Sequence, residues 1–308
     1  MIESFKIVGT QVFILFILMG VGFVCQRLRF LTPGGVKCIT ELMLYIITPS
    51  MLINAFQREF QRELLSGFLI SAAAAAVGHA LAILIGFIFI RERDKARRSV
   101  FRFGVIFSNC GYMSLPLQQA LIGDEAVFYG ASYIAVFNIF LWTYGLALMC
   151  NGKEKISVRK ALLNPGTVSV CIGLLLFFCS IRLPGIISQP IEYLSALNTP
   201  VPMMIIGYYI ACLDFRSVLR SRGEFITLLL RLIVLPLIML FGLYLLGVRG
   251  SLLVSCVISA SAPVAAISTM FATKYDGEAR LSASCVASST LLSIVTMTFI
   301  VGLASWLA

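Results

Sequence analysis

Charged residues are scarce in this sequence, and it contains a single histidine. Charged residues occupy 12% of the 308 positions, whereas hydrophobic residues occupy 59%. Because soluble globular domains carry about 25% charged residues, the composition excludes a chain of that class. Few ionisable groups interrupt the apolar runs, and none of them is an obvious carboxylate for a proton relay inside a membrane.

Patterns typical of enzymes and metal sites are also absent. The sequence has no HExxH pattern and no phosphate-binding loop. Its nine cysteines form no close Cys-x2-Cys pair, and most lie in apolar runs, where a free cysteine behaves as a small hydrophobic residue. Gly130-x-Ser132 resembles a rhomboid-like serine motif, but its only possible histidine partner is in span three. Intramembrane aspartyl proteases need both carboxylates in one site, whereas Asp124 and Asp276 would lie on opposite sides of the membrane. We therefore expect no enzyme, no metal site and no cofactor.

Long apolar runs predict an all-α polytopic membrane protein. A helix needs about 20 apolar residues to cross a hydrocarbon core of about 30 Å. The N-terminus lacks the pattern of a cleavable signal, so the first run is interpreted as a retained span. Ten spans are predicted, at 6–26, 37–56, 64–90, 101–122, 126–150, 163–181, 190–213, 224–246, 251–272 and 279–307.

A repeat at an offset of 151 residues relates the two halves of the chain. Each half would hold five spans, and this odd number means that the second copy crosses the membrane in the opposite direction, as in many secondary transporters. The predicted units are a first five-helix repeat at 1–150, a short cytoplasmic linker at 151–160 and an inverted repeat at 161–308. The matching pairs are Pro33-Gly34 with Pro184-Gly185, Glu41 with Glu192, and Thr48-Pro49 with Thr199-Pro200.

The basic residues are distributed unequally between the two predicted faces. The chain has a formal net charge of +10, and 18 of its 24 lysines and arginines lie in or beside the loops that follow odd-numbered spans. The positive-inside rule then places these loops in the cytoplasm and both termini outside. We interpret the basic clusters as signals for orientation in the plasma (inner) membrane and as contacts for membrane lipids, with no role in nucleic-acid binding.

Spans four and nine contain helix-breaking residues at equivalent positions of the two repeats. A half-helix that begins inside the membrane presents unpaired N–H groups and about half a positive charge, which favours an anion. Paired interruptions of this kind indicate a transport site near the membrane midplane. The predicted substrate-binding residues are Asn109, Cys110, Gly111, Ser114, Ser259, Ser261 and Pro263, with Pro116 and Pro263 as crossover residues.

Other residues in the spans are candidates for hinges or for coupling. Pro49 and Pro200 remove a helical hydrogen bond in spans two and seven, as either moving hinges or packing kinks. Glu41 is interpreted as a helix-end or gating group, like Glu192, with ion coupling as the alternative. Two further coupling candidates lie deep in spans three and eight. His79 serves either as a pH sensor or as a hydrogen-bonded bundle residue, and Arg231 lies inside its span or reaches toward the interface.

Taken together, these motifs resemble the auxin efflux carrier family, which includes plant auxin exporters and bacterial malate and malonate permeases. The resemblance implies ten helices with helices four and nine crossed, and an elevator-like movement of the site. It also implies that Asn109 and Asn138 bind the substrate carboxylate. The chain departs from the plant carriers at Ser108, where they have proline, and in its short linker. The resemblance is carried by Asn109-x6-Pro116-Leu117, Phe137-Asn138-x3-Trp142-Thr143, Asn164-Pro165-x7-Gly173-Leu174, Thr199-Pro200-x6-Gly207, Arg231-x4-Pro236, Ala262-Pro263 and Ser288-Ser289-Thr290-Leu291-Leu292-Ser293.

The sequence therefore predicts a secondary transporter of a small organic anion, either a mono- or dicarboxylate or an auxin-like acid. One alternative is a sodium-coupled symporter of the bile-acid-carrier type, in which unwound carbonyls and acidic or amide side chains bind the ions. A second alternative is an anion channel. The identity of the anion, the direction of transport, the driving ion and the formation of a homodimer are left open.

Overall fold

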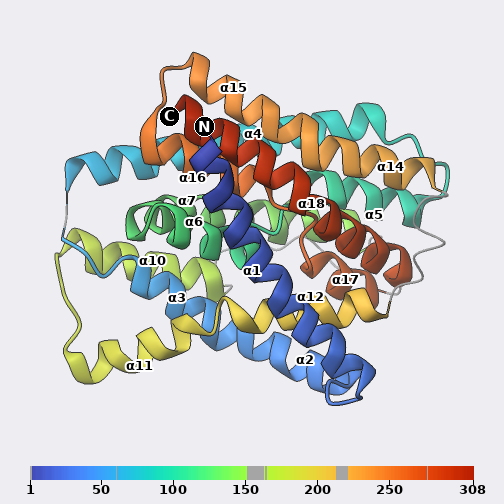
Figure 1. Cartoon of the computed structure of the whole chain (residues 1–308), viewed down its shortest axis with the longest axis horizontal. Helices are drawn as coiled ribbons and strands as arrows, with labels where there is room; N and C mark the ends of the chain where they lie inside the picture. The colour runs from blue at the N-terminus through green and yellow to red at the C-terminus, as the bar shows by residue number, and fades with distance from the viewer. Residues whose placement is uncertain (1, 60, 151–162, 164, 213–220, 276) are drawn as a thin grey trace.

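The computed structural model describes residues 2–59, 61–150, 163, 165–212, 221–275 and 277–308 (Figure 1). The predicted linker and Asp276 therefore lie outside the described residues. Helices account for all the regular elements in the described part, apart from one isolated β-bridge. Its first half contains α1 (Ile2–Arg27), α2 (Pro33–Leu42), η1 (Met43–Ile47), α3 (Thr48–Ala55), α4 (Arg62–Phe89), α5 (Lys95–Ile106), η2 (Cys110–Ser114), α6 (Leu115–Leu121), α7 (Asp124–Phe140), η3 (Leu141–Gly145) and α8 (Leu146–Met149).

The second half is organised in a similar order of long and broken helices. Its described elements are α10 (Pro165–Phe178), α11 (Gly185–Ala196), α12 (Pro200–Ala211), α14 (Arg222–Leu229), η4 (Leu230–Val234), α15 (Leu235–Leu245), α16 (Gly250–Ser261), α17 (Ile267–Lys274) and α18 (Ala279–Leu307).

Six helical stretches in the described part are long and apolar enough to cross a membrane, and α10 and α16 are shorter apolar helices. On α4, the large side chains of Leu69, Val77, Leu84 and Phe87 are exposed, as expected for a surface that faces lipid tails. These features agree with a polytopic membrane protein, whereas the ten spans and the inverted repeat stay predictions. The six stretches are Gly9–Arg27, Pro33–Ala55, Arg62–Phe89, Asp124–Met149, Arg222–Leu245 and Ala279–Leu307.

Helices from the two halves of the chain pack together. Two groups can be distinguished, with α2, α3, α11 and α12 at the bottom of Figure 1 and α14 and α15 at its top. In the lower group α3 packs against α10 and α11, while α1 runs from the upper part of Figure 1 downward and packs along α12 and against α18. In the other group α4 packs against α7, and α16 packs against α7, α15 and α18. We call these the scaffold group (α1–α3 and α10–α12) and the crossover group (α4–α8 and α14–α18).

A wide π-type turn precedes several of the prolines. Proline has no N–H, so the carbonyl four residues earlier loses its helical donor, and a wider turn relieves this local mismatch. Span seven is instead interrupted, because α11 ends at Ala196 and α12 begins at Pro200. In each case one residue separates the end of the turn from the proline: the turn is Met43–Ile47 before Pro49, Cys110–Ser114 before Pro116 and Leu230–Val234 before Pro236.

The backbones of α1 and α12 touch at two glycines. A Cβ atom at Gly22 would lie 2.0 Å from the carbonyl oxygen of Met204, and one at Gly207 would lie 1.9 Å from that of Met19. Because both obstacles are backbone atoms, no side-chain rotation can relieve the clash. Small residues at such positions allow membrane helices to approach closely, and this contact fixes the spacing within the scaffold group.

We expect Gly22→Ala to destabilise the protein by about 1–3 kcal/mol, the usual cost of overpacking. Gly20→Ala is the matched control, because no atom of the described residues lies within 4 Å of a Cβ atom at that position of the same helix. Both substitutions favour the helix to the same degree, so the difference between them isolates the clash. Thermal unfolding in one detergent measures it, and equal melting temperatures would contradict the tight contact.

Candidate functional site

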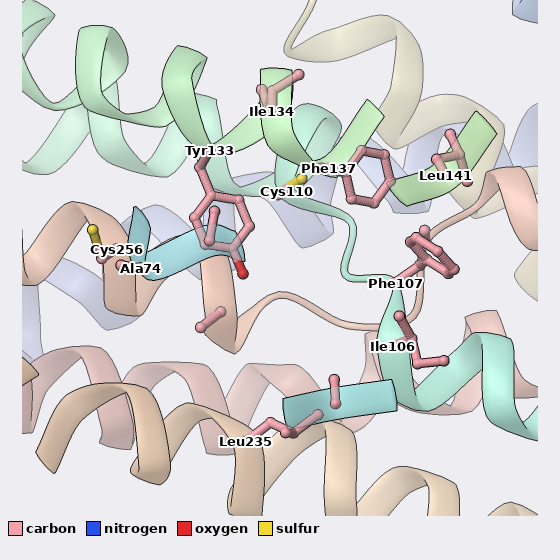
Figure 2. Packing of buried hydrophobic residues seen from close by; sticks show 14 of the residues in the cluster. Ala74, Ile106, Phe107, Cys110, Tyr133, Ile134, Phe137, Leu141, Leu235 and Cys256 are labelled. Atoms are coloured by element: carbon pink, nitrogen blue, oxygen red, sulfur yellow. The ribbon is translucent and has the colours of Figure 1, made fainter. Parts of the chain in front are cut away.

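The backbone breaks between α5 and η2 and between α16 and α17 meet in a short antiparallel pairing. The Asn109 N–H donates to the Pro263 carbonyl at 2.8 Å, and the Ala265 N–H donates to the Phe107 carbonyl at 3.0 Å. Figure 2 shows Phe107 and Cys110 at the two ends of the extended segment, beneath the helix that carries Tyr133 and Phe137. Backbone polar groups need partners inside a membrane, and each break supplies them for the other. We call this region the crossover.

Arg231 binds the ends of the two helices that lead into the crossover. Its guanidinium donates to the carbonyls of Val105 at 3.2 Å and Ile106 at 3.4 Å, in the last turn of α5. It also donates to the carbonyl of Ala260, in the last turn of α16. Helix C-termini carry a partial negative charge, so one buried cation stabilises both. With 3% of its surface exposed, Arg231 does not reach the membrane interface.

Two side chains that sequence reasoning missed connect the crossover with its surroundings. The Ser289 hydroxyl of α18 accepts a hydrogen bond from the Val264 N–H at 3.0 Å. The Gln118 amide of α6 donates to the Ser255 carbonyl at 2.9 Å and to the Ser259 hydroxyl at 2.8 Å on α16. Both residues lie in apolar helices where only the folded structure brings a partner within reach.

The half-helices that begin at the crossover border a small cavity. Tyr112 of η2 and Ile267 of α17 line it on one side, and Thr40 and Tyr209 belong to the scaffold wall. Its volume is about 20 Å³, which is room for about one water molecule. None of the described residues that line it carries a charged side chain. An organic anion could occupy this position only after the two helix groups separate.

A larger polar cavity lies on the face where the charge distribution predicts both termini. It has a volume of about 470 Å³ and is lined by Arg58, Asp124, Glu192 and Asn198, among others. Burial lowers the pKa of Arg58, although Asp124 and Glu125 oppose this shift. Asn198 donates to the Gly111 carbonyl at 3.4 Å, so the cavity reaches the crossover.

Some of the predicted binding residues have side chains without a hydrogen-bond partner, and others are already hydrogen-bonded within the protein. Asn109 and Ser261 are buried at the crossover, and their Nδ2 and Oγ atoms have no hydrogen-bond partner among the described residues. Ser114 instead donates to the Ile258 carbonyl at 3.2 Å, and Ser259 accepts from Gln118. These two serines therefore join η2 and α6 to α16, which leaves Asn109 and Ser261 as the better candidates for ligand contacts.

The remaining binding candidates contribute backbone or lie to one side. Cys110 is fully enclosed, and the carbonyls of Gly111 and Pro263 are hydrogen-bonded to Asn198 and Asn109. Asn138 is half-buried on α7, beside Phe137, whose ring lies 5.6 Å from that of Phe107. The structure thus places Asn138 next to the crossover without a contact that assigns its role.

His79 is buried among aromatic rings of the crossover group. Its Nδ1 atom lies 2.7 Å from the Ala75 carbonyl, and its ring stacks on Phe140 with the centroids 5.1 Å apart. The rings of Phe107 and Tyr133 also surround it, at 6.0 and 5.7 Å. Such surroundings favour a neutral imidazole. Its role in coupling stays a prediction.

The predicted hinge residues lie where their helices widen or break. Pro49 and Pro116 follow the π-type turns η1 and η2 in continuous helical stretches, whereas Pro200 begins α12 after the interruption of span seven. Glu41 and Glu192 are exposed, and Glu192 lines the polar cavity. These positions are compatible with the predicted hinge and gating roles, which stay predictions.

Six apolar stretches of membrane-spanning length, together with two helices that break in the interior beside a buried cation, are typical of integral membrane transporters. The chain belongs to the membrane transport protein family, whose profile matches residues 7–160 and 153–301. Because this is a transport family, the protein is a transporter and not an enzyme. The resemblance to auxin efflux carriers inferred from the motifs is thereby confirmed.

Individual relatives agree with this assignment. The chain is 24% identical to an uncharacterized transporter of Methanothermobacter thermautotrophicus, over 91% of this chain and 93% of the relative. It is 22% identical to an uncharacterized transporter of Methanocaldococcus jannaschii, over 93% and 95%. A third match is 26% identical to auxin efflux carrier component 1 of Arabidopsis thaliana, over 44% of this chain and 22% of the plant protein.

We expect Arg231→Lys to destabilise the protein by about 2 kcal/mol, because an ammonium group cannot bind both helix ends as the guanidinium fork does. Arg249→Lys is the matched control. Arg249 also donates to two carbonyls, at 2.6 and 2.8 Å, but at an exposed helix end. Thermal unfolding of both variants measures the difference. A melting temperature of the Arg231 variant equal to that of the control would remove Arg231 as the residue that joins the helices.

Proposed function

We propose that this protein is a secondary transporter that moves a small organic anion by an elevator-type alternating-access mechanism. The observation that carries the proposal is the crossover, where two half-helices begin beside a buried and unpartnered Asn109 amide. Unpaired N–H groups at helix N-termini and a free amide are the donors that a carboxylate needs. They lie in the protein interior, as expected for a site that exchanges between two faces.

Electrostatics support an anion as the substrate. Arg231 is bound by carbonyls, and no described carboxylate lies within 4 Å of its guanidinium. Its positive charge is therefore only partly balanced by the helix C-termini. The N-terminal ends at Cys110 and Ile267 add partial positive charge to the same region. An anion at the crossover would be stabilised without a direct ion pair.

The lining of the small cavity favours an anion with one carboxylate and an apolar body. Met43, Ile205 and Met270 provide apolar surface, while Tyr112 and Tyr209 offer hydroxyl groups. A second carboxylate would be placed against apolar side chains, which is costly without a charged or hydrogen-bonding partner. Monocarboxylates, including auxin-like aromatic acids, therefore rank above dicarboxylates as substrates.

The arrangement of the two helix groups supports an elevator mechanism. The crossover lies in one group, and the cavity wall that contains Thr40, Pro202 and Tyr209 lies in the other. A displacement of one group against the other would therefore carry the site along the wall. The polar cavity already reaches Gly111 from one face through Asn198. The wide or broken turns next to Pro49 and Pro200 provide places where the scaffold helices can bend.

Asn109→Ala tests the binding site. We expect purified protein to be stabilised against heat by one of malonate, malate, 2-oxoglutarate, simple aromatic acids or indole-3-acetate, since a ligand of the folded state raises its stability. The shift should vanish in Asn109→Ala, because the carboxylate loses an amide donor. Asn54→Ala, in the polar cavity, is the control that should retain the shift. An unchanged affinity of Asn109→Ala would remove this residue from the site.

The same measurements distinguish the alternatives left open by the sequence. If the anion raises the melting temperature only in the presence of sodium, a sodium-coupled symporter would be favoured. In proteoliposomes, saturable exchange of labelled anion against internal anion is expected of a carrier. Flux that neither saturates nor accelerates with internal anion would instead indicate a channel.

A further inference from the structure

Glu224 is a buried carboxylate that the crossover mechanism does not use. It lies in the first turn of α14, where only 1% of its surface is exposed. Within the described part of the chain, no cationic group approaches its oxygens to ion-pair distance. From the sequence it is only the first residue of a predicted span. An unpaired carboxylate at such a position is costly in its charged form and is therefore a candidate for proton binding.

Two serines of α18 contact the same oxygen of Glu224. The hydroxyl of Ser284 lies 2.9 Å from Oε1, and that of Ser288 lies 3.0 Å from it. The Ser288 hydroxyl also lies 2.7 Å from the Ser284 carbonyl, to which it can donate instead. A serine has a single hydroxyl hydrogen and two acceptor lone pairs. When Ser288 donates to Ser284, its contact with Glu224 is favourable only if Oε1 carries a proton.

The serine pair therefore accommodates both forms of the side chain. A charged Glu224 accepts hydrogen bonds from both hydroxyls. A neutral Glu224 donates its own hydrogen to Ser288, which then donates to the Ser284 carbonyl. Rotation of one hydroxyl group converts one arrangement into the other, so protonation requires no movement of the helices.

The described groups around Glu224 include no cation in direct contact with its carboxylate. Among the described residues, Arg97 on α5 acts on it electrostatically, but the Arg97 guanidinium lies 3.8 Å from Glu92 and 3.4 Å from Ser221. On α18, Cys285 is the other titratable side chain near enough for Glu224 to act on it electrostatically. Further along the same helix face lies Arg231. Glu224 lies two residues from the exposed Arg222, in the first turn of α14 and thus close to the predicted basic face.

Two connections lead from Glu224 to the crossover. Glu224 and Arg231 are seven residues apart and share one face of span eight, about 10 Å apart along the axis. On α18, Ser288 is followed directly by Ser289, whose hydroxyl accepts from the Val264 N–H at the crossover. A change in the charge of Glu224 thus acts on the buried cation and on the helix segment that binds the crossover.

We propose that Glu224 is a proton-binding site that links protonation from the basic face to anion movement at the crossover. The transport part of this proposal rests on the proposed function, whereas proton binding itself does not. The proton comes from water at the basic face, binds Oε1 and returns to water, and no other bond is formed or broken. An anion that moves with this proton would be driven by a pH gradient.

Infrared difference spectroscopy between acid and alkaline buffer tests proton binding directly. We expect a carbonyl band of a protonated carboxyl group in the wild-type protein and its loss in Glu224→Gln. Glu63→Gln is the matched control, because Glu63 lies in the first turn of α4 but is exposed. A spectrum of Glu224→Gln with every carboxyl band of the wild type would overturn the proposal.

Transport in proteoliposomes tests the link to anion movement, with the anion identified by thermal shift. An imposed pH gradient should accelerate uptake several-fold in the wild type and in Glu63→Gln. Glu224→Gln should still exchange labelled anion against internal anion, at a rate that no longer depends on pH. A gradient response that persists in Glu224→Gln would contradict the proposal. Absence of anion exchange by the wild type would instead contradict the proposed function, and the infrared result would then decide on Glu224 alone.

Ser284→Ala keeps Glu224 in place and provides a second variant if Glu224→Gln does not fold. It removes a hydrogen bond to the charged form, so the midpoint of the infrared titration should move to higher pH. Ser305→Ala is its control, since it makes the same substitution in the last turns of the same helix. An unchanged midpoint for Ser284→Ala would exclude the serine pair from the site.

Discussion

The structure depends on the need of every buried backbone group for a hydrogen-bond partner where water is absent. Two helices that break in the interior would expose unpaired carbonyls and N–H groups. The antiparallel pairing of Ser108 with Val264 satisfies part of this need, and the Arg231 guanidinium satisfies carbonyls on both sides. The breaks are stable only together, because each one lacks partners without the other.

This constraint explains why so many serines lie in apolar helices. Their hydroxyl groups join helices at short range, as between Ser255 of α16 and the Ala126 carbonyl, or between Ser71 of α4 and the Tyr129 carbonyl, at 3.0 and 2.9 Å. In a medium where the hydrophobic effect does not hold helices together, hydrogen bonds and close packing do so. The crossover group uses hydroxyl groups, whereas α1 and α12 of the scaffold group use glycine contacts. This difference is compatible with a crossover group that binds a polar ligand and a scaffold group that provides a closely packed surface beside it.

Charge is arranged along one direction of the molecule. The polar cavity contains Arg58 together with Asp124 and Glu192, while the predicted cytoplasmic face carries most of the basic residues. Between them lie Arg231 and, toward the basic face, Glu224. Anions would be concentrated at the basic face and would find partial positive charge again at the crossover. Because Glu224 lies between these two regions, a change in its charge would alter the electrostatic potential that an anion meets there.

Much of the architecture was predictable from local chemistry, because apolar length, proline and small polar residues act through the backbone of their own segment. The apolar spans, the breaks around Asn109 and Pro263 and the family followed from such patterns. Contacts between distant segments did not. Three features depend on which helix faces meet. They are the burial of Arg231 away from the interface, the hydrogen bond of Ser114, and the contact of Glu224 with Ser284 and Ser288. The sequence by itself determined where helices form and where they must break, since those are local backbone effects. Only the tertiary structure decided which polar groups find partners, since that depends on atoms far apart in the chain coming within 3 Å.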